Sequence, residues 1–211
     1  MEEIDGELIE VKKLSNQSFV DQQHWIKYQT ATANGIPRSL LVSSLEFLDK
    51  RDAVLDIGAG ALDDTQFLLD QGFRTVIAVD QTPQFKEPSV AIGIQFSYIE
   101  EKFENYEIPR EKFDLISAQY SLAFTAPTHF AEFWKNIRAG LKPNGVFVGQ
   151  FFGDRDQWSP NKEMSFQSKS EVQKLISEME ILYFVESEFQ ENNTRKKRWH
   201  YFDVIAKKRS Q

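Results

Sequence analysis

The sequence predicts an α/β fold built around a parallel β-sheet, and two observations carry this prediction. The first is residues 53–80, which follow the order strand, glycine turn, helix, strand. Ala53–Ile57 is a short apolar run typical of a parallel strand covered on both faces, and it breaks at Gly58 and Gly60. The second is that further apolar runs, each bounded by turn residues, recur along the chain.

A nucleotide site is predicted where this first unit turns. Asp63 and Asp64 are expected to cap the helix, and Gly72 to end it. The second strand, 75–79, closes with Asp80, about twenty residues beyond the turn. Glycines let a ligand approach the backbone closely, and an acid at this point can accept two hydrogen bonds from a ribose diol.

The turn also indicates which nucleotide would bind. A dinucleotide-binding turn has a third glycine at the position where this chain has Asp63. Asp63 and Asp64 would repel a pyrophosphate at the N-terminus of the helix. The sequence therefore predicts an adenosine ligand without phosphates and argues against a nicotinamide-dependent oxidoreductase.

Three motifs resemble those of class I S-adenosylmethionine (SAM)-dependent methyltransferases. Residues 54–60 (VLDIGAG) resemble the first motif of that family, 113–119 (FDLISAQ) its fourth-strand motif, and 141–147 (LKPNGVF) the turn into its fifth strand. The nearest likeness is to the small bacterial methyltransferases related to the tellurite-resistance type. Leu62 is a departure, because the family often has a third glycine there.

The resemblance implies a Rossmann-like three-layer αβα sandwich with a mostly parallel, seven-stranded sheet. A C-terminal antiparallel β-hairpin would close the sheet, and the β-rich runs 181–189 and 199–206 fit its two strands. The basic residues 195–198 fall in the connection between these runs and are expected to be solvated.

The expected organisation is a flexible N-terminal segment, 1–16, followed by a single methyltransferase domain, 17–211. Within the domain we expect N-terminal helices in 17–50, a cofactor-binding core in 53–152, and an acceptor-side loop, helix and closing hairpin in 153–211.

Helical periodicity predicts three further helices around the sheet. The first has Pro37 in its first turn. The second buries an aromatic stripe between Phe130 and Leu141, with His129 on the surface. The third begins with a capping box formed by Ser168 and Glu171.

The cofactor that the resemblance implies is SAM, with S-adenosylhomocysteine as its product. Carried onto this chain, the family's motif positions give the expected cofactor-binding residues Asp56, Gly58, Ala59, Gly60, Asp80, Gln81, Ile99, Glu100 and Gln119. For residues 99–101 the alternative is that they begin a solvated helix.

Tyr28, Tyr120 and Trp158 are the residues expected to line the acceptor pocket. Tyr120 follows the fourth strand, at the sheet edge where ligands of open α/β sheets bind. The alternative for Tyr28 is packing within the N-terminal helix, and the alternative for Trp158 is an ordinary charged surface loop. For His200 both a strand-end position and a pocket wall stay open.

Composition limits the partners. The 211 residues contain 25 basic and 32 acidic side chains, a net charge of −7, which argues against a nucleic-acid binder. The absence of cysteine suits a reducing compartment. We recognise no signal peptide and no apolar run of ~18 residues that would span a membrane. We therefore expect a cytoplasmic protein with a small-molecule acceptor, and the oligomeric state stays open.

No catalytic triad or metal-ligand cluster is recognisable, and no catalytic residue can be named. Methyl transfer from a sulfonium is an in-line displacement that proximity, orientation and desolvation can drive without a general base. The predicted function is methyl transfer from SAM to an unidentified acceptor, a small molecule or a metalloid oxyanion. The alternatives are a methyltransferase for protein or RNA, and a cofactor-binding scaffold of the same fold without catalysis.

Overall fold

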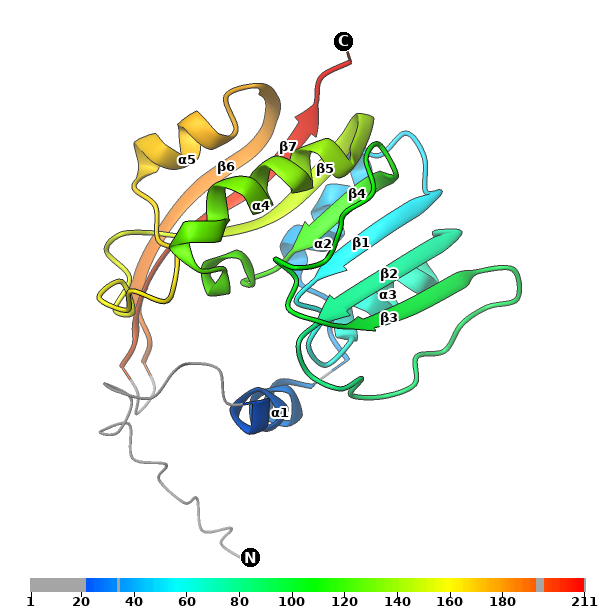
Figure 1. Cartoon of the computed structure of the whole chain (residues 1–211), viewed down its shortest axis with the longest axis horizontal. Coiled ribbons are helices and arrows are strands. Elements are labelled where there is room, and N and C mark those ends of the chain that lie inside the picture. The colour runs from blue at the N-terminus through cyan, green and yellow to red at the C-terminus, as the bar shows by residue number, and fades with distance from the viewer. Residues whose placement is uncertain (1–21, 34, 193–195, 211) are drawn as a thin grey trace, which may run out of the picture.

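A computed structural model describes residues 22–33, 35–192 and 196–210, and it has a seven-stranded sheet with helices on both faces (Figure 1). The strands are β1 (Ala53–Ile57), β2 (Thr75–Asp80), β3 (Gln95–Glu100), β4 (Phe113–Ala118), β5 (Leu141–Phe152), β6 (Met179–Gln190) and β7 (Arg198–Lys208). The helices are α1 (Gln22–Thr32), α2 (Ser39–Ser44), α3 (Asp63–Asp70), α4 (Pro127–Gly140) and α5 (Lys169–Leu175), with short 3₁₀ turns η2 (Leu45–Phe47) and η3 (Leu122–Phe124). The predicted N-terminal segment 1–16 lies outside the described residues.

The strand order is β3-β2-β1-β4-β5-β7-β6. The first five strands run parallel, and β7 lies antiparallel between β5 and β6. This confirms the predicted three-layer α/β fold with its closing hairpin. In Figure 1, α4 lies in front of the sheet, α2 and α3 lie behind it, and α1 lies below the carboxyl ends of β1 and β2.

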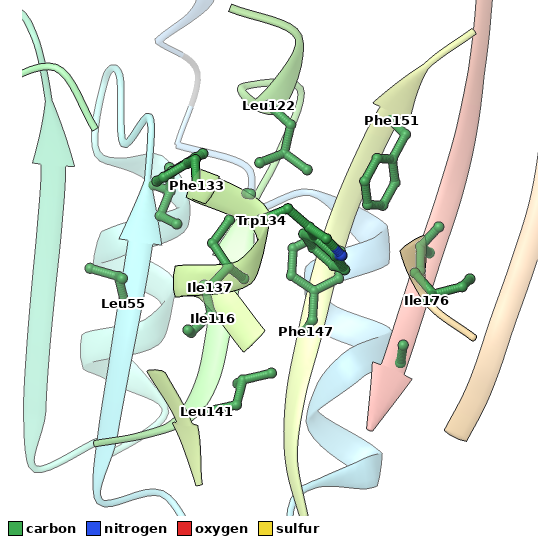
Figure 2. Packing of buried hydrophobic residues seen from close by; sticks show 14 of the residues in the cluster. Leu55, Ile116, Leu122, Phe133, Trp134, Ile137, Leu141, Phe147, Phe151 and Ile176 are labelled. Atoms are coloured by element: carbon green, nitrogen blue, oxygen red, sulfur yellow. The ribbon is translucent and has the colours of Figure 1, made fainter. Parts of the chain in front are cut away.

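Each face of the sheet is covered by its own apolar cluster. On the α4 face, the predicted aromatic stripe is buried, and Trp134 packs edge-on against Phe147 and Phe151 at ring-centroid distances of 4.9 and 5.1 Å (Figure 2). On the opposite face, Leu41 of α2 and Leu68 of α3 pack on the sheet. Two-sided burial explains why β1 and β4 are apolar over almost their whole length.

An ion pair connects two of the sequence motifs. Lys142 Nζ lies 3.0 Å from both carboxylate oxygens of Asp114, and Asp114 Oδ2 also accepts hydrogen bonds from the backbone N–H groups of Asp52 and Ala53. The contact therefore holds the start of β1 against β4 and β5, so Asp114 and Lys142 support the sheet at the end away from the carboxyl ends of its parallel strands.

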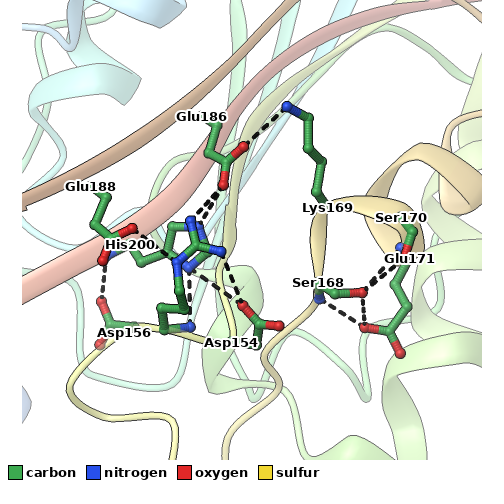
Figure 3. Close-up of polar contacts among 10 residues, drawn as sticks. Asp154, Asp156, Ser168, Lys169, Ser170, Glu171, Glu186, Glu188 and His200 are labelled. Carbon is green, nitrogen blue, oxygen red and sulfur yellow. Dashed lines mark hydrogen bonds and ion pairs between the residues drawn. The ribbon is translucent and has the colours of Figure 1, made fainter.

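Three helix boundaries test the sequence predictions. The capping box of Ser168 and Glu171 is confirmed at the start of α5 (Figure 3). Pro37 was expected inside a helix, which is wrong: α2 begins at Ser39, after the extended Arg38. The prediction that Asp63 and Asp64 cap the helix is also wrong, because both lie in the first turn of α3. The carboxylate of Asp63 binds Lys86, and that of Asp64 binds Arg38.

No helix among the described residues is long and apolar enough to cross a membrane. The cytoplasmic location stays a prediction.

Replacing Trp134 with alanine tests the packing on the α4 face. We expect Trp134→Ala to lower the free energy of unfolding by about 3 to 5 kcal/mol, because it removes a buried ring and the hydrogen bond from Nε1 to the carbonyl of Leu175. Urea denaturation measures this loss. His129→Ala, on the exposed side of the same helix, is the control and should change the value by less than about 0.5 kcal/mol. Equal losses in both variants would contradict the packing.

Candidate functional site

The glycine turn between β1 and α3 is packed tightly on one side and open on the other. Gly58 has φ +74°, and a Cβ built on it would lie 2.5 Å from Cβ of Ser121, in the segment after β4. Gly60 has φ +52°, and a Cβ there would meet nothing closer than the carbonyl oxygen of Gly58 at 3.9 Å. The turn thus rests against the β4 segment and leaves space over Gly60 that a ligand could occupy.

Leu62 stands where the resembling family often has glycine, and its backbone keeps the conformation that glycine favours. Its φ is +65°, in the left-handed region. Its side chain is fully buried with Ala59 and Ala78. The leucine side chain therefore points into the interior and leaves the open side of the turn free.

Asp80, the predicted ribose-binding acid, lies directly beside this turn. Its Oδ2 accepts a hydrogen bond from the Gly60 N–H at 2.9 Å, and its Oδ1 accepts from the N–H and hydroxyl of Thr82. A carboxylate offers about four acceptor positions, so Asp80 can accept a further hydrogen bond. Gln29 of α1 donates to the Thr82 hydroxyl at 2.5 Å, which brings α1 to the same edge of the sheet.

The expected adenine segment is the end of a strand. Ile99 and Glu100 are the last residues of β3, and the Glu101 N–H donates to the carbonyl of Asp80 at 2.9 Å. The alternative, a solvated helix start, is wrong, because residues 101–112 contain no helix. Contact of Ile99, Glu100 and the neighbouring Gln81 with adenine stays a prediction.

Asp56 lies beneath the turn, away from its open side. It is almost fully buried and accepts a hydrogen bond from the Thr65 hydroxyl at 2.6 Å, which ties β1 to α3. Burial, reinforced by the nearby charge of Asp64, raises the pKa of Asp56 from 3.8 to about 7. Asp56 therefore fixes the position of α3 relative to β1.

Two buried polar atoms within the first three residues after β4 have no partner among the described residues. They are Nε2 of Gln119, whose side chain is 6% exposed, and Oγ of Ser121. Oε1 of Gln119 accepts from Gln150 Nε2 at 3.3 Å. Buried polar atoms in native proteins are almost always hydrogen-bonded, so these two atoms, beside the Gly58 turn, fit a polar ligand.

A cavity of about 360 Å³ begins at Gln119 and Tyr120 and extends over β5 and β7 on the α2 side of the sheet. Its polar lining comes mainly from Arg38, Gln119, Tyr120, Gln150, Tyr201 and Asp203. Burial raises the pKa of Asp203 above its usual value, and a hydrogen bond from Gln150 opposes this rise. Tyr120, an expected pocket residue, lies in this cavity.

The other two expected pocket residues do not line the cavity. Tyr28 is 46% exposed and contacts Trp25 edge-on at 5.9 Å. Trp158 belongs to an aromatic cluster that includes Phe152 and Trp199. The acceptor role of both residues stays a prediction.

The aromatic cluster encloses Lys197, one of the basic residues expected to be solvated, and for Lys197 that expectation is wrong. Its Nζ lies 3.6 Å from the ring centroid of Trp158, 3.1 Å from that of Trp199 and 3.0 Å from Oδ1 of Asp156. The side chains of Lys197 and Asp156 are only 8% and 0% exposed. Burial lowers the pKa of Lys197 to about 8, although Asp156 opposes the shift.

His200 lies inside the hairpin and does not line the cavity. Its ring is fully buried, Nδ1 accepts the Arg155 N–H at 3.0 Å, and Nε2 lies 3.2 Å from Glu186 (Figure 3). A Cβ on Gly153 would overlap the ring at 1.9 Å. His200 thus fixes the loop after β5 to the hairpin.

Sequence reasoning missed Arg38, Tyr201 and Asp203. The available signal was polar residues inside buried strands: Gln150 interrupts an apolar run in β5, and Asp203 does the same in β7. The two residues pair across the strands, and Gln150 Nε2 donates to Asp203 at 2.9 Å. Arg38 carried no such signal, because it reaches the cavity from the loop before α2.

Residues 54–145 match a family described as methyltransferase domain. Among curated proteins, N-terminal Xaa-Pro-Lys N-methyltransferase 1 of Danio rerio is 32% identical over 99 residues, which make up 44% of this chain and 44% of the relative. The chain therefore matches less than half the length of this relative.

Solved structures of similar fold include proteins named methyltransferases. The 1,6-didemethyltoxoflavin-N1-methyltransferase of Burkholderia thailandensis, solved with 1,6-didemethyltoxoflavin and S-adenosylhomocysteine, has 19% identity and a TM-score of 0.62, covering 90% of this chain and 87% of that one. TehB from Haemophilus influenzae has 16% identity and a TM-score of 0.65, covering 89% of this chain and 67% of that one.

The pKa of Asp56 predicts how stability depends on pH. Between about pH 4 and pH 7 the folded protein keeps a proton on Asp56 that the unfolded chain releases, so the free energy of unfolding should fall as pH rises, by up to about 1.4 kcal/mol per unit. Asp56→Asn keeps an acceptor for Thr65 and removes this titration. Urea denaturation across this range should give a shallower slope for the variant, whereas Asp70→Asn, at the exposed end of α3, should keep the wild-type slope. If the free energy of unfolding changed with pH equally in all three proteins, the raised pKa of Asp56 would be contradicted.

The buried ion pair predicts a large loss on removing one partner. Asp156→Ala should lower the free energy of unfolding by about 3 to 5 kcal/mol, because Lys197 stays buried without its counter-charge. Adding Lys197→Met should restore part of the loss. Glu132→Ala breaks an exposed pair with Lys135 and should lose less than about 1 kcal/mol. If the double variant were less stable than Asp156→Ala, the pair would not be the cause.

Proposed function

We propose that this chain, a class I SAM-dependent methyltransferase by its fold and its matched domain, transfers a methyl group from SAM to a small acceptor. The observation that carries the proposal is the open side of the Gly58–Gly60 turn, flanked by Asp80 and by the unpartnered Gln119 Nε2 and Ser121 Oγ.

In this proposal each part of the site has a separate task. Gly60 leaves room for the cofactor, Asp80 accepts a hydroxyl of its ribose, and Gln119 donates to its amino-acid part. Ile99, Glu100 and Gln81 border the adenine. Asp56 keeps the first turn of α3 in register with these groups through Thr65. The turn follows β1, next to its neighbour β4. The strand order reverses between these two strands: β2 and β3 follow on the β1 side, and β5 follows on the β4 side. Ligands of such sheets bind at this reversal point.

The bound cofactor supplies a methyl group on a sulfonium, whose sulfur leaves as a neutral thioether without needing a proton. The task of the protein is then to hold the acceptor in line with that methyl group and to exclude water. Tyr120 and Gln150 are placed for this positioning, because both line the cavity beside Gln119. No residue is needed as a base if the acceptor arrives with a free lone pair.

The acceptor is proposed to be a small molecule, because the cavity is lined by residues of three strands and α2 and has the size of a small-molecule site. The division expected from the sequence fits this proposal: residues 53–152 would hold the cofactor, and 153–211 would contribute Tyr201 and Asp203 to the acceptor side. The curated relative is a protein N-methyltransferase by name, so a peptide amine is the second candidate.

Cofactor binding is tested best at Gly60. Calorimetric titration with SAM and with S-adenosylhomocysteine should show micromolar binding to the wild type and at least tenfold weaker binding to Gly60→Ala, because the new methyl group occupies the open side of the turn. NAD should not bind.

The matched control is Gly72→Ala. Gly72 also has a positive φ, +79°, and a Cβ there meets nothing within 4 Å, so the backbone strain is similar but the site is distant. Its cofactor affinity should equal that of the wild type. Equal weakening in both variants would attribute the effect to backbone strain, and absence of cofactor binding to the wild type would contradict the proposed function.

A further inference from the structure

We propose that the acceptor is a small amine that enters the cavity as its ammonium ion and is held there by Asp203. The inference rests on the proposed function, because the amine becomes an acceptor only if a methyl donor binds beside Gln119. It is carried by the juxtaposition of an unpaired carboxylate, two glutamine amides and two tyrosine rings in a single cavity.

Of the two charged residues that line the cavity, Arg38 has an ionic partner and Asp203 has none among the described residues. Among the described residues, no lysine, arginine or histidine forms an ion pair with Asp203, whose carboxylate accepts a hydrogen bond from Gln150 Nε2 at 2.9 Å. Arg38, the cationic residue of the lining, is held by Asp64, with Nε 3.4 Å from Oδ2, and lies 4.9 Å over the Tyr120 ring. The cavity therefore lacks one positive charge next to Asp203.

The glutamines fix the carboxylate and connect it to the cofactor side. Gln150 is 1% exposed; its Nε2 donates to both Asp203 and Gln119, and its Oε1 accepts the Tyr120 N–H at 2.9 Å. Both amides thus have set orientations. Gln119 Nε2 is more than nine-tenths buried and has no partner in the part of the chain that the structure describes, so it is left to donate to a ligand.

The aromatic rings suit the same ligand. Tyr120 and Tyr201 meet edge-on at 5.4 Å between ring centroids, and both border Asp203 in the cavity. Arg38 already lies over the Tyr120 ring, so the rings shape the site and Asp203 supplies the attraction, because a desolvated carboxylate binds an ammonium more strongly than an exposed one does. An anionic acceptor such as a metalloid oxyanion would instead be repelled by Asp203.

An ammonium ion has no lone pair, so it must lose one proton to water before transfer. Its nitrogen then forms the new N–C bond as the C–S bond of the donor breaks, sulfur keeps that electron pair, and the product is a methylated ammonium ion. Asp203 acts as a positioning residue that holds the remaining N–H groups.

The test compares amines with carboxylates that have the same ring body. Tyramine is paired with 4-hydroxyphenylacetate, and tryptamine with indole-3-acetate, each titrated calorimetrically into protein saturated with S-adenosylhomocysteine. At least one amine should bind the wild type ten times more tightly than its carboxylate partner. Asp203→Asn, which keeps the acceptor for Gln150, should weaken that amine at least tenfold.

The control variant is Glu180→Gln, which removes a charge from the exposed side of the same hairpin and should leave amine affinity unchanged. The inference is overturned if neither amine binds, if the carboxylates bind more tightly, or if Asp203→Asn keeps wild-type affinity. Failure of S-adenosylhomocysteine to bind the wild type would instead refute the proposed function, so the two failures are distinct.

Discussion

The contact between Gly58 and the segment after β4 is the constraint on which the candidate site depends. Because a Cβ at Gly58 would lie 2.5 Å from that of Ser121, any side chain there would push the two segments apart. The close approach brings the carboxyl ends of β1 and β4 together, so that the segment after β4 lies against the glycine turn whose Gly60 N–H binds Asp80. The same glycine turn thus allows close packing at Gly58 and leaves space for a ligand at Gly60.

The sheet was predictable from the sequence because strand ends and turns carry local signals. β1 matches its predicted bounds, β4 lies within the fourth-strand motif, and the hairpin and the capping box of Ser168 are confirmed. Motifs in the sequence mark Asp80 and Gln119 as candidate site residues, and their contact with the cofactor stays a prediction. Arg38 and Asp203 could not be placed, because their positions follow from how α2 and β7 pack. Lys197 was misjudged because a basic run gives no sign that two tryptophans will enclose one member.

Carboxylates that are wholly or partly buried in this fold are compensated in different ways. Asp114 is balanced by Lys142 and two backbone N–H groups, and Asp156 by Lys197. Asp56 has no such partner in the described part of the chain, and burial raises its pKa, which favours the neutral carboxyl group. Asp203 is half-buried, with a neutral amide beside it and no ionic partner among the described residues. Of these four acids, Asp203 is the one that lines the cavity.

The position of β7 has a consequence for how the chain reaches its native state. β7 is the last strand of the sheet in chain order, yet it lies between β5 and β6 and pairs with both. Until it arrives, β5 has an unpaired edge, and unpaired edges invite association with other chains. From the completion of β5 at Phe152 until β7 is made, a nascent chain would therefore carry an exposed apolar strand edge, and β7 would have to close that edge before another molecule does.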